Sequence, residues 1–286
     1  MKGRLIILLG PTAVGKTEYS LSLAERYSSP IISCDSRQIY REMRIGTAVP
    51  SDEQLARVKH YFIRTVPVTE YYTAGIYETQ AMALIEKLFA EGHDTLVMTG
   101  GSMFYIDAVC NGLGGIPTAD LEFREKLKER VAAEDAGWLE SELRRLDPEA
   151  AASMDMSNTQ RLFRAVEICL WTGRPYSSFK SDAPVSRDFT IEKTGLSRPR
   201  EVLYDRINRR VLQMMDEGLV EEARSLLTYR SCQALNTVGY SELFDYFDGR
   251  TSLDEAVTLI QRNTRHYAKR QISWWRRDSS IRWIEL

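Results

Sequence analysis

The stretch LLGPTAVGKT at residues 8–17 decides the fold, because it fits the phosphate-loop pattern G-x-x-x-x-G-K-[ST]. A short apolar run at residues 5–9 predicts a buried strand before it, and a helical pattern follows. Backbone N–H groups of residues 12–17 can then cradle phosphate oxygens at the helix N-terminus. Lys16 adds a positive charge, and the Thr17 hydroxyl can help to hold Mg²⁺. The predicted phosphate-binding residues are Gly10, Pro11, Thr12, Ala13, Val14, Gly15, Lys16 and Thr17.

Strand-like and helix-like segments alternate along much of the chain, and glycines follow strand ends directly. This alternation predicts an α/β fold, a P-loop NTPase-like core with a mostly parallel sheet flanked by helices. Ligands bind such sheets at the carboxyl ends of the strands, where Asp35 and Ser102 would join the phosphate loop. The further predicted strands are residues 30–34, 61–66, 94–99 and 185–194, and the predicted helices include 81–90 and 200–228.

The middle of the chain differs from this pattern. From residue 119 to about residue 174 it is nearly all helical in character, without a convincing strand. We therefore predict an all-helical insertion at residues 118–184. The two flanking segments, residues 1–117 and 185–286, would together form the catalytic core.

The composition is that of a globular protein with a full core, with 286 residues of which 43% are hydrophobic and 27% charged. No apolar run approaches the about 20 residues needed to cross a bilayer. The run before the phosphate loop is too short for a signal-peptide core, so we expect a cytoplasmic protein without membrane contact. The four cysteines are far apart and form no C-x-x-C pair, which disfavours zinc and disulfides.

Charge is distributed unevenly although the net charge is only −2. Residues 262–277 contain six Lys or Arg side chains and no acidic one, whereas residues 120–149 are rich in Asp and Glu. A basic helix face of this kind indicates a local anionic partner such as RNA, and the alternative is a solvated surface face.

The stretch SCDSRQIYREMRIGTAVPS at residues 33–51 places Asp35 directly after a predicted buried strand. An aspartate there can cap the segment that follows, bind Mg²⁺, or act as a general base. Hydrophobic periodicity does not separate these three roles.

The chain resembles the tRNA dimethylallyltransferases, also called tRNA isopentenyltransferases, in blocks that span nearly all of it in the family's order. The blocks are GPTAVGKT, CDSRQIYREMRIGTAVPS, GGSMFYIDAV, NTQRLFRAVEICLWTGRP, SRPREVLYDRINRRVLQMMDEGLVEEA, VGYSE and RHYAKRQISWWRR. Such enzymes move a prenyl group from dimethylallyl diphosphate to N6 of the adenine on the 3′ side of the anticodon. The resemblance implies that the phosphate loop holds diphosphate with Mg²⁺, in a monomer without an obligate protein partner.

The resemblance also implies roles for single residues. Asp35 would accept the N6 proton, and Arg206, or alternatively Arg210, would act with Lys16 on the departing diphosphate. Ser102 stands where the family has a substrate-placing threonine, so the hydroxyl is kept and a methyl is lost. The implied catalytic residues are Asp35, Ser102, Arg206 and Lys16. The implied tRNA contacts are Asp35, Ser36, Arg37, Gln38, Ser102, Arg124, Gln160, Arg161, Leu162, Phe163, Arg164, Gly239 and Tyr240.

Several of these contacts lie on the helical insertion, which in the family grips the anticodon stem-loop. Ser241 replaces a lysine or arginine of the family's block, so one basic contact is absent. Three other functions compete: prenylation of free adenine nucleotides, an ATP-dependent small-molecule kinase, and an RNA-binding protein with a vestigial nucleotide fold. The insertion favours tRNA over a free nucleotide, and a kinase leaves the later blocks unexplained.

Overall fold

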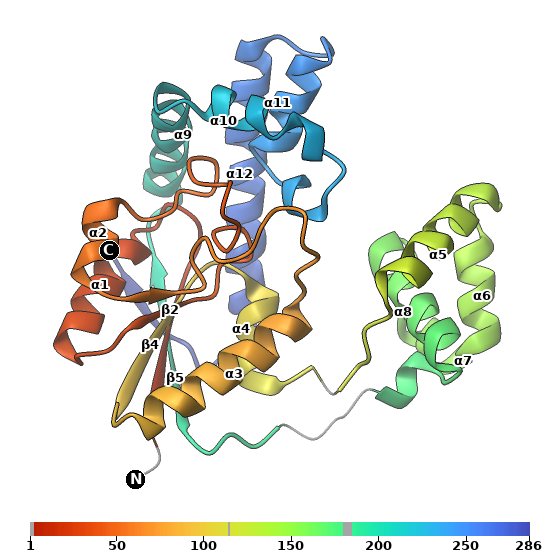
Figure 1. The fold of residues 1–286 in the computed structure, drawn as a ribbon, viewed down its shortest axis with the longest axis horizontal. Coiled ribbons are helices and arrows are strands. Elements are labelled where there is room, and N and C mark those ends of the chain that lie inside the picture. Colours follow the sequence, from red (N-terminus) through yellow and green to blue (C-terminus); the bar gives the residue numbers. More distant parts are fainter. Residues whose placement is uncertain (1–2, 114, 180–184) are drawn as a thin grey trace. The chain divides into compact units, whose positions relative to one another are not determined.

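The computed structural model describes residues 3–113, 115–179 and 185–286 (Figure 1). The chain divides into two compact units, one formed by Met1–Cys110 with Arg187–Leu286 and the other by Asn111–Ser186. The end of the predicted insertion, residues 180–184, lies outside the described residues. Among the helices that the structure describes, none is both long and apolar enough to span a membrane.

The first unit is built on a six-stranded sheet with the order β3-β2-β4-β1-β5-β6. Every neighbouring pair of strands is parallel, which confirms the predicted α/β fold with a parallel sheet. The strands are β1 (Arg4–Leu9), β2 (Ile31–Ser33), β3 (His60–Tyr61), β4 (Thr95–Thr99), β5 (Thr190–Ser197) and β6 (Arg282–Glu285).

Both faces of the sheet are covered, which explains why β1 is a continuous apolar run. Leu5, Ile7 and Leu9 belong to the largest hydrophobic cluster, whereas Leu8 belongs to a second cluster that includes Leu196. Successive side chains of a strand point to opposite faces, so a strand between two helical layers must be apolar at every position.

The helices of this unit follow the strands and pack on the sheet or on one another. Helix α1 contacts β1, β2 and β4, α3 contacts β4, and α9 contacts α12. Figure 1 shows α9, α10, α11 and α12 together, above the sheet in that view. The α-helices are α1 (Lys16–Arg26), α2 (Asp52–Arg57), α3 (Ala74–Ala90), α4 (Met103–Asn111), α9 (Arg200–Asp216), α10 (Leu219–Ser225), α11 (Tyr240–Phe247) and α12 (Leu253–Trp275).

Four predicted elements differ from the observed ones. The helix predicted at 200–228 is broken at Gly218, whose φ of 98° is left-handed and ends a helical run. The strand predicted at 61–66 ends after Tyr61, because Phe62 and Arg64 also have positive φ. The helix predicted at 81–90 begins at Ala74 after the N-cap Thr73, and the strand predicted at 185–194 is displaced to β5.

The second unit is helical in its described part, with a core of its own. Leu143, Ala150 and Ala165 are fully buried at its centre. Three helix starts are capped by side chains, those of Asp120, Asp147 and Asn158, and each cap of this type contributes about 1 kcal/mol. Its helices are α5 (Leu121–Ala133), α6 (Trp138–Leu146), α7 (Pro148–Ser153), α8 (Thr159–Thr172) and the 3₁₀ turn η1 (Tyr176–Phe179).

Candidate active site

A cavity of about 1350 Å³ lies at the carboxyl ends of the parallel strands. Segments that follow four strands line it: Lys16 after β1, Asp35 after β2, Gly101 after β4 and Arg198 after β5. Helices α9 and α12 supply further lining side chains. Parallel α/β sheets bind their ligands at this edge, so we take the cavity as the candidate active site.

The phosphate loop enters helix α1 in the geometry that its sequence predicts. Gly15 has a φ of 117° at the N-cap, a conformation that only glycine adopts freely, and α1 begins at Lys16. The Lys16 ammonium donates to the carbonyl oxygens of Gly10 at 2.7 Å and Pro11 at 2.9 Å. Thr17 also lines the cavity, so the helix N-terminus offers an ammonium, a hydroxyl and backbone N–H groups to an anion.

Three arginines approach the same loop and join Lys16 around it. Burial is the largest cause that lowers the pKa of Arg206 and that of Arg210. Arg198 and Arg209 lower the pKa of Arg206 further, and Arg206 in turn lowers that of Arg210. Such crowding of cations is unfavourable on its own and is relieved by a bound anion. The contacts are Arg198 Nε to the Val14 carbonyl oxygen at 2.8 Å, Arg206 Nε to the Ala13 carbonyl oxygen at 2.8 Å, and an Arg210 guanidinium nitrogen to Thr12 Oγ1 at 3.4 Å.

Arg206 and Arg210 differ in their surroundings. The pKa of Arg210 is raised by Asp35 against the effect of burial, whereas Arg198 and Arg209 add to the lowering of the pKa of Arg206. The charge of Asp35 therefore acts on Arg210, whereas the charges that act on Arg206 are those of other arginines.

Burial lowers the pKa of Lys16 to about 8, opposed by Asp35 and assisted by Arg210. The charged form binds an anion, and this form is lost as the pH rises through 8. We expect the affinity for inorganic pyrophosphate to fall about tenfold between pH 8 and pH 9.5, measured by calorimetric titration. Lys16→Arg, whose guanidinium stays charged, controls for ionisation of the ligand. A wild-type profile parallel to that of Lys16→Arg would contradict the assignment.

Asp35 has a defined orientation in the cavity. Its Oδ1 accepts hydrogen bonds from the backbone N–H groups of Arg37 at 2.9 Å and Gln38 at 3.1 Å. This is the capping role that the sequence left open, and it fixes the carboxylate where it lines the cavity. Oδ2 lies on the side of Gly101, 3.8 Å from the position that a Cβ on this glycine would take.

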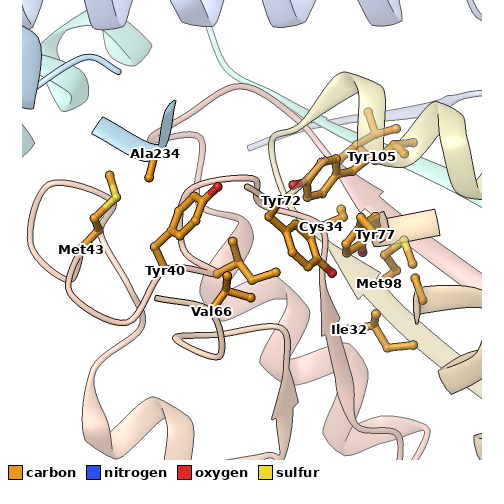
Figure 2. Packing of buried hydrophobic residues seen from close by; sticks show 14 of the residues in the cluster. Ile32, Cys34, Tyr40, Met43, Val66, Tyr72, Tyr77, Met98, Tyr105 and Ala234 are labelled. Atoms are coloured by element: carbon orange, nitrogen blue, oxygen red, sulfur yellow. The ribbon is translucent and has the colours of Figure 1, made fainter. Parts of the chain in front are cut away.

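Buried tyrosines support the end of β2 that carries Asp35 (Figure 2). The Tyr77 hydroxyl donates to the Ser33 carbonyl oxygen at 2.9 Å, and the rings of Tyr77 and Tyr105 stack with centroids 4.1 Å apart. Such a pair stabilises by about 0.5–1.5 kcal/mol beyond its burial. Burial raises the pKa of both tyrosines, so they stay neutral and act through packing.

Arg37 and Gln38, predicted tRNA contacts, hold neighbouring backbone in this structure. The Gln38 amide donates to the carbonyl oxygens of Thr47 at 3.1 Å and Ala48 at 2.9 Å. The Arg37 guanidinium donates to the carbonyl oxygens of Gln233, Ala234 and Asn236. Ser36, Arg37 and Gln38 nevertheless line the cavity.

Three other predicted residues take different positions. Ser102 is buried beside the lining residue Gly101, and its backbone N–H donates to the Cys34 carbonyl oxygen at 3.2 Å. Gly239 lines the cavity. Tyr240 is fully buried, and its hydroxyl donates to Glu222 at 2.7 Å, so its side chain has a packing role here.

Two of the predicted tRNA contacts of the second unit, Arg124 and Arg164, pair with a buried carboxylate. Glu167 has no exposed side-chain surface and pairs with both Arg124, at 3.0 Å, and Arg164. Gln160 and Arg161 are exposed on α8, whereas Leu162 is buried and Phe163 half-buried beneath the Arg124 guanidinium.

The sequence interpretation gave no role to Arg198, Tyr267 or Gln271, all of which line the cavity. Arg198 follows β5 directly, so its place after a strand is the signal that identifies it. Tyr267 and Gln271 are one turn apart on α12, and only the fold brings them to Gly101.

A parallel sheet with a phosphate loop, four cations around that loop and the carboxylate of Asp35 in one cavity defines a P-loop enzyme that acts on a phosphorylated substrate. A family model described as IPP transferase matches residues 38–278. The chain therefore belongs to the IPP transferase family and is a prenyltransferase.

Two relatives match over nearly the whole length of both chains. The tRNA dimethylallyltransferase 1 of Bacteroides fragilis is 51% identical over 98% of this chain and 93% of its own. The full-length tRNA isopentenylpyrophosphate transferase from Bacillus halodurans is 38% identical, with a TM-score of 0.72 over 99% of this chain and 90% of that one. A eukaryotic dimethylallyltransferase acting on tRNA shares the fold, with a TM-score of 0.83 at 23% identity over 99% of this chain and 74% of that one.

Proposed function

We propose that the protein transfers a dimethylallyl group from dimethylallyl diphosphate to N6 of the adenine 3′ of the anticodon in tRNA. Diphosphate is released. The observation that carries this proposal is the meeting of Asp35 with the phosphate loop and its cations in one cavity. The relatives named tRNA dimethylallyltransferase support transfer of a dimethylallyl group to tRNA.

The chemistry needs a base beside the attacking nitrogen and positive charge beside the leaving diphosphate. N6 attacks the allylic carbon while the bond from that carbon to the diphosphate oxygen breaks. Asp35 accepts the proton that N6 loses. Lys16 with Arg206 or Arg210 stabilises the negative charge that collects on the leaving diphosphate. The adenine must leave its stacked loop to reach the cavity.

The residues at the phosphate loop fit Mg²⁺. This ion is usually bound by one or two carboxylates together with substrate phosphates, and in phosphate loops a Ser or Thr hydroxyl binds it. The Thr17 hydroxyl lines the cavity next to Lys16, and Thr17 would hold the ion with the diphosphate. Bound there, Mg²⁺ would supply further positive charge for the leaving group.

The Asn111–Ser186 unit is proposed to grip the anticodon stem-loop. The exposure of Gln160 and Arg161 on α8 supports this, since phosphate contacts need accessible donors. Lys269 and Arg270 are exposed on α12 and would add contacts to the RNA backbone. The remaining proposed contacts of the Asn111–Ser186 unit are Arg124, Leu162, Phe163 and Arg164.

Arg161→Gln tests this role of the second unit, because removing an exposed arginine leaves no buried charge unpaired. We expect stem-loop affinity to fall about two- to fivefold, the usual weight of one exposed ion pair. The salt dependence of log Kd should lose about one unit of slope. Arg145→Gln, an exposed arginine on α6 paired with Glu142, is the matched control. An unchanged salt slope in Arg161→Gln would remove this contact from the proposal.

The experiment that tests the function is a transfer assay with Mg²⁺ and labelled dimethylallyl diphosphate. The acceptors are an anticodon stem-loop with adenine 3′ of the anticodon, the same stem-loop without it, and free AMP. Label on the first stem-loop alone supports the proposal. Label on AMP indicates an adenylate isopentenyltransferase instead, and turnover of labelled ATP without prenyl transfer indicates a kinase.

A further inference from the structure

Gln271 on α12 is fully buried and connects segments that follow two different strands. Its Oε1 accepts a hydrogen bond from the Thr12 backbone N–H at 2.9 Å. Its Nε2 donates to the Gly101 carbonyl oxygen at 2.7 Å. An N–H can only donate and a carbonyl oxygen can only accept, so these partners fix the orientation of the amide.

The two connected segments belong to different halves of the cavity. Thr12 lies in the phosphate loop after β1, and Gly101 lies in the turn after β4, next to Ser102. The Thr12 N–H, expected to cradle phosphate, is therefore engaged by the protein itself. The backbone N–H groups of the later part of the loop therefore remain to bind phosphate.

The turn at Gly101 is built for this close approach. A Cβ on Gly101 would lie 2.6 Å from Gln271 Nε2, so a larger residue would displace the amide. The Tyr267 hydroxyl donates to the same Gly101 carbonyl oxygen at 3.1 Å. Two side chains one turn apart on α12 thus hold the turn that precedes Ser102.

Alkyl transfer depends on the distance between the leaving group and the nucleophile. Reacting atoms must approach to about 3–3.5 Å, and a misplacement of about 1 Å can cost 10²-fold in rate. Resting on the proposed function, we propose that Gln271 is a positioning residue that sets the separation between the diphosphate cradle and the Asp35–Gly101 side of the cavity. Gln271 acts through Thr12 and Gly101 and not by touching the substrate.

The test compares Gln271→Leu with Gln261→Leu. Gln261 lies on the same helix, and its amide donates to the Asn208 carbonyl oxygen of α9 at 3.2 Å, outside the cavity. For Gln271→Leu we expect kcat for prenyl transfer to fall about 10²-fold. The dissociation constants of inorganic pyrophosphate and of the stem-loop should each change less than threefold. Gln261→Leu should keep kcat within twofold of the wild type.

Gln271→Glu adds a second measurement, the pH dependence of its activity relative to wild type, which a merely structural role would not change. The carboxyl group keeps the size and the acceptor oxygen, and it can donate to Gly101 only when protonated. Its activity relative to wild type should therefore fall as the pH rises and recover as the pH is lowered. This ratio also decides the proposal if Gln271→Leu fails to fold.

A wild-type kcat in Gln271→Leu would overturn the proposal, as would pyrophosphate affinity that falls as steeply as kcat. An activity ratio of Gln271→Glu that is independent of pH would also overturn it. If the proposed function itself is wrong, the wild-type protein will transfer no prenyl group to any stem-loop, and this result is distinct from every outcome for the Gln271 variants.

Discussion

Asp35→Asn should lower the rate of prenyl transfer by about 10²- to 10⁴-fold, the usual contribution of a general base. The asparagine keeps an oxygen that can accept from the N–H groups of Arg37 and Gln38, the two hydrogen bonds that Oδ1 makes in this structure. It cannot take up the N6 proton. The measurement is single-turnover transfer of labelled dimethylallyl to a stem-loop, with enzyme in excess.

The controls separate the base from the other roles that an aspartate here can have. Asp245→Asn, on α11 and paired with Arg250 outside the cavity, should transfer at the wild-type rate. Pyrophosphate affinity of Asp35→Asn in the presence of Mg²⁺ should stay within a few-fold of wild type. A large loss of that affinity would make Asp35 a metal ligand, and undiminished transfer would exclude it as the base.

Lys16→Met should reduce prenyl transfer by about 10²- to 10³-fold, the usual effect of removing one group that stabilises developing charge. The ammonium is the cation that contacts the loop carbonyl groups of Gly10 and Pro11, and the methionine keeps most of its length. Pyrophosphate affinity should fall as well, because ground state and transition state both carry the anion. Calorimetric titration and the transfer assay measure the two effects.

The matched control is Lys87→Met, an exposed lysine on α3 that pairs with Glu91. It should leave both quantities unchanged. Pyrophosphate binding by Lys16→Met at wild-type strength would refute the diphosphate site. The same titration on Arg206→Met and Arg210→Met distinguishes the two candidate arginines, since the one nearer the leaving group should lose more transfer rate than affinity.

Short sequence patterns predicted the elements that are encoded by residues close together in the chain. The apolar run of β1, the phosphate loop and the start of α1 are encoded within residues 4–17, and the structure has all three. The parallel sheet also followed from the alternation of strand-like and helix-like segments. The carboxyl-edge rule predicted the phosphate loop, Asp35 and Ser102 close together. The phosphate loop and Asp35 line one cavity, whereas Ser102 is buried beside the lining residue Gly101.

The failures concern backbone conformations and contacts that no local pattern encodes. Residues 61–66 are rich in aromatic and β-branched side chains, as in a strand. The positive φ of Phe62 and Arg64 turns the chain, however, and Val66 forms an isolated bridge with Tyr40. Gln271 lies 259 residues from Thr12 and 170 from Gly101, so its two hydrogen bonds depend on the whole fold. No sequence pattern distinguishes this one glutamine from the other polar residues of the basic helix.

Helix α12 runs without interruption from Leu253 to Trp275 and carries both Gln271 and the exposed basic side chains. A ligand that tilts this helix must shift Thr12 and Gly101 with it. RNA on the basic face and diphosphate in the loop would then be heterotropic effectors of each other. Thermodynamic reciprocity requires one coupling factor: whatever the RNA adds to donor affinity, the donor adds to RNA affinity. The same coupling factor applies whichever of the two substrates binds first.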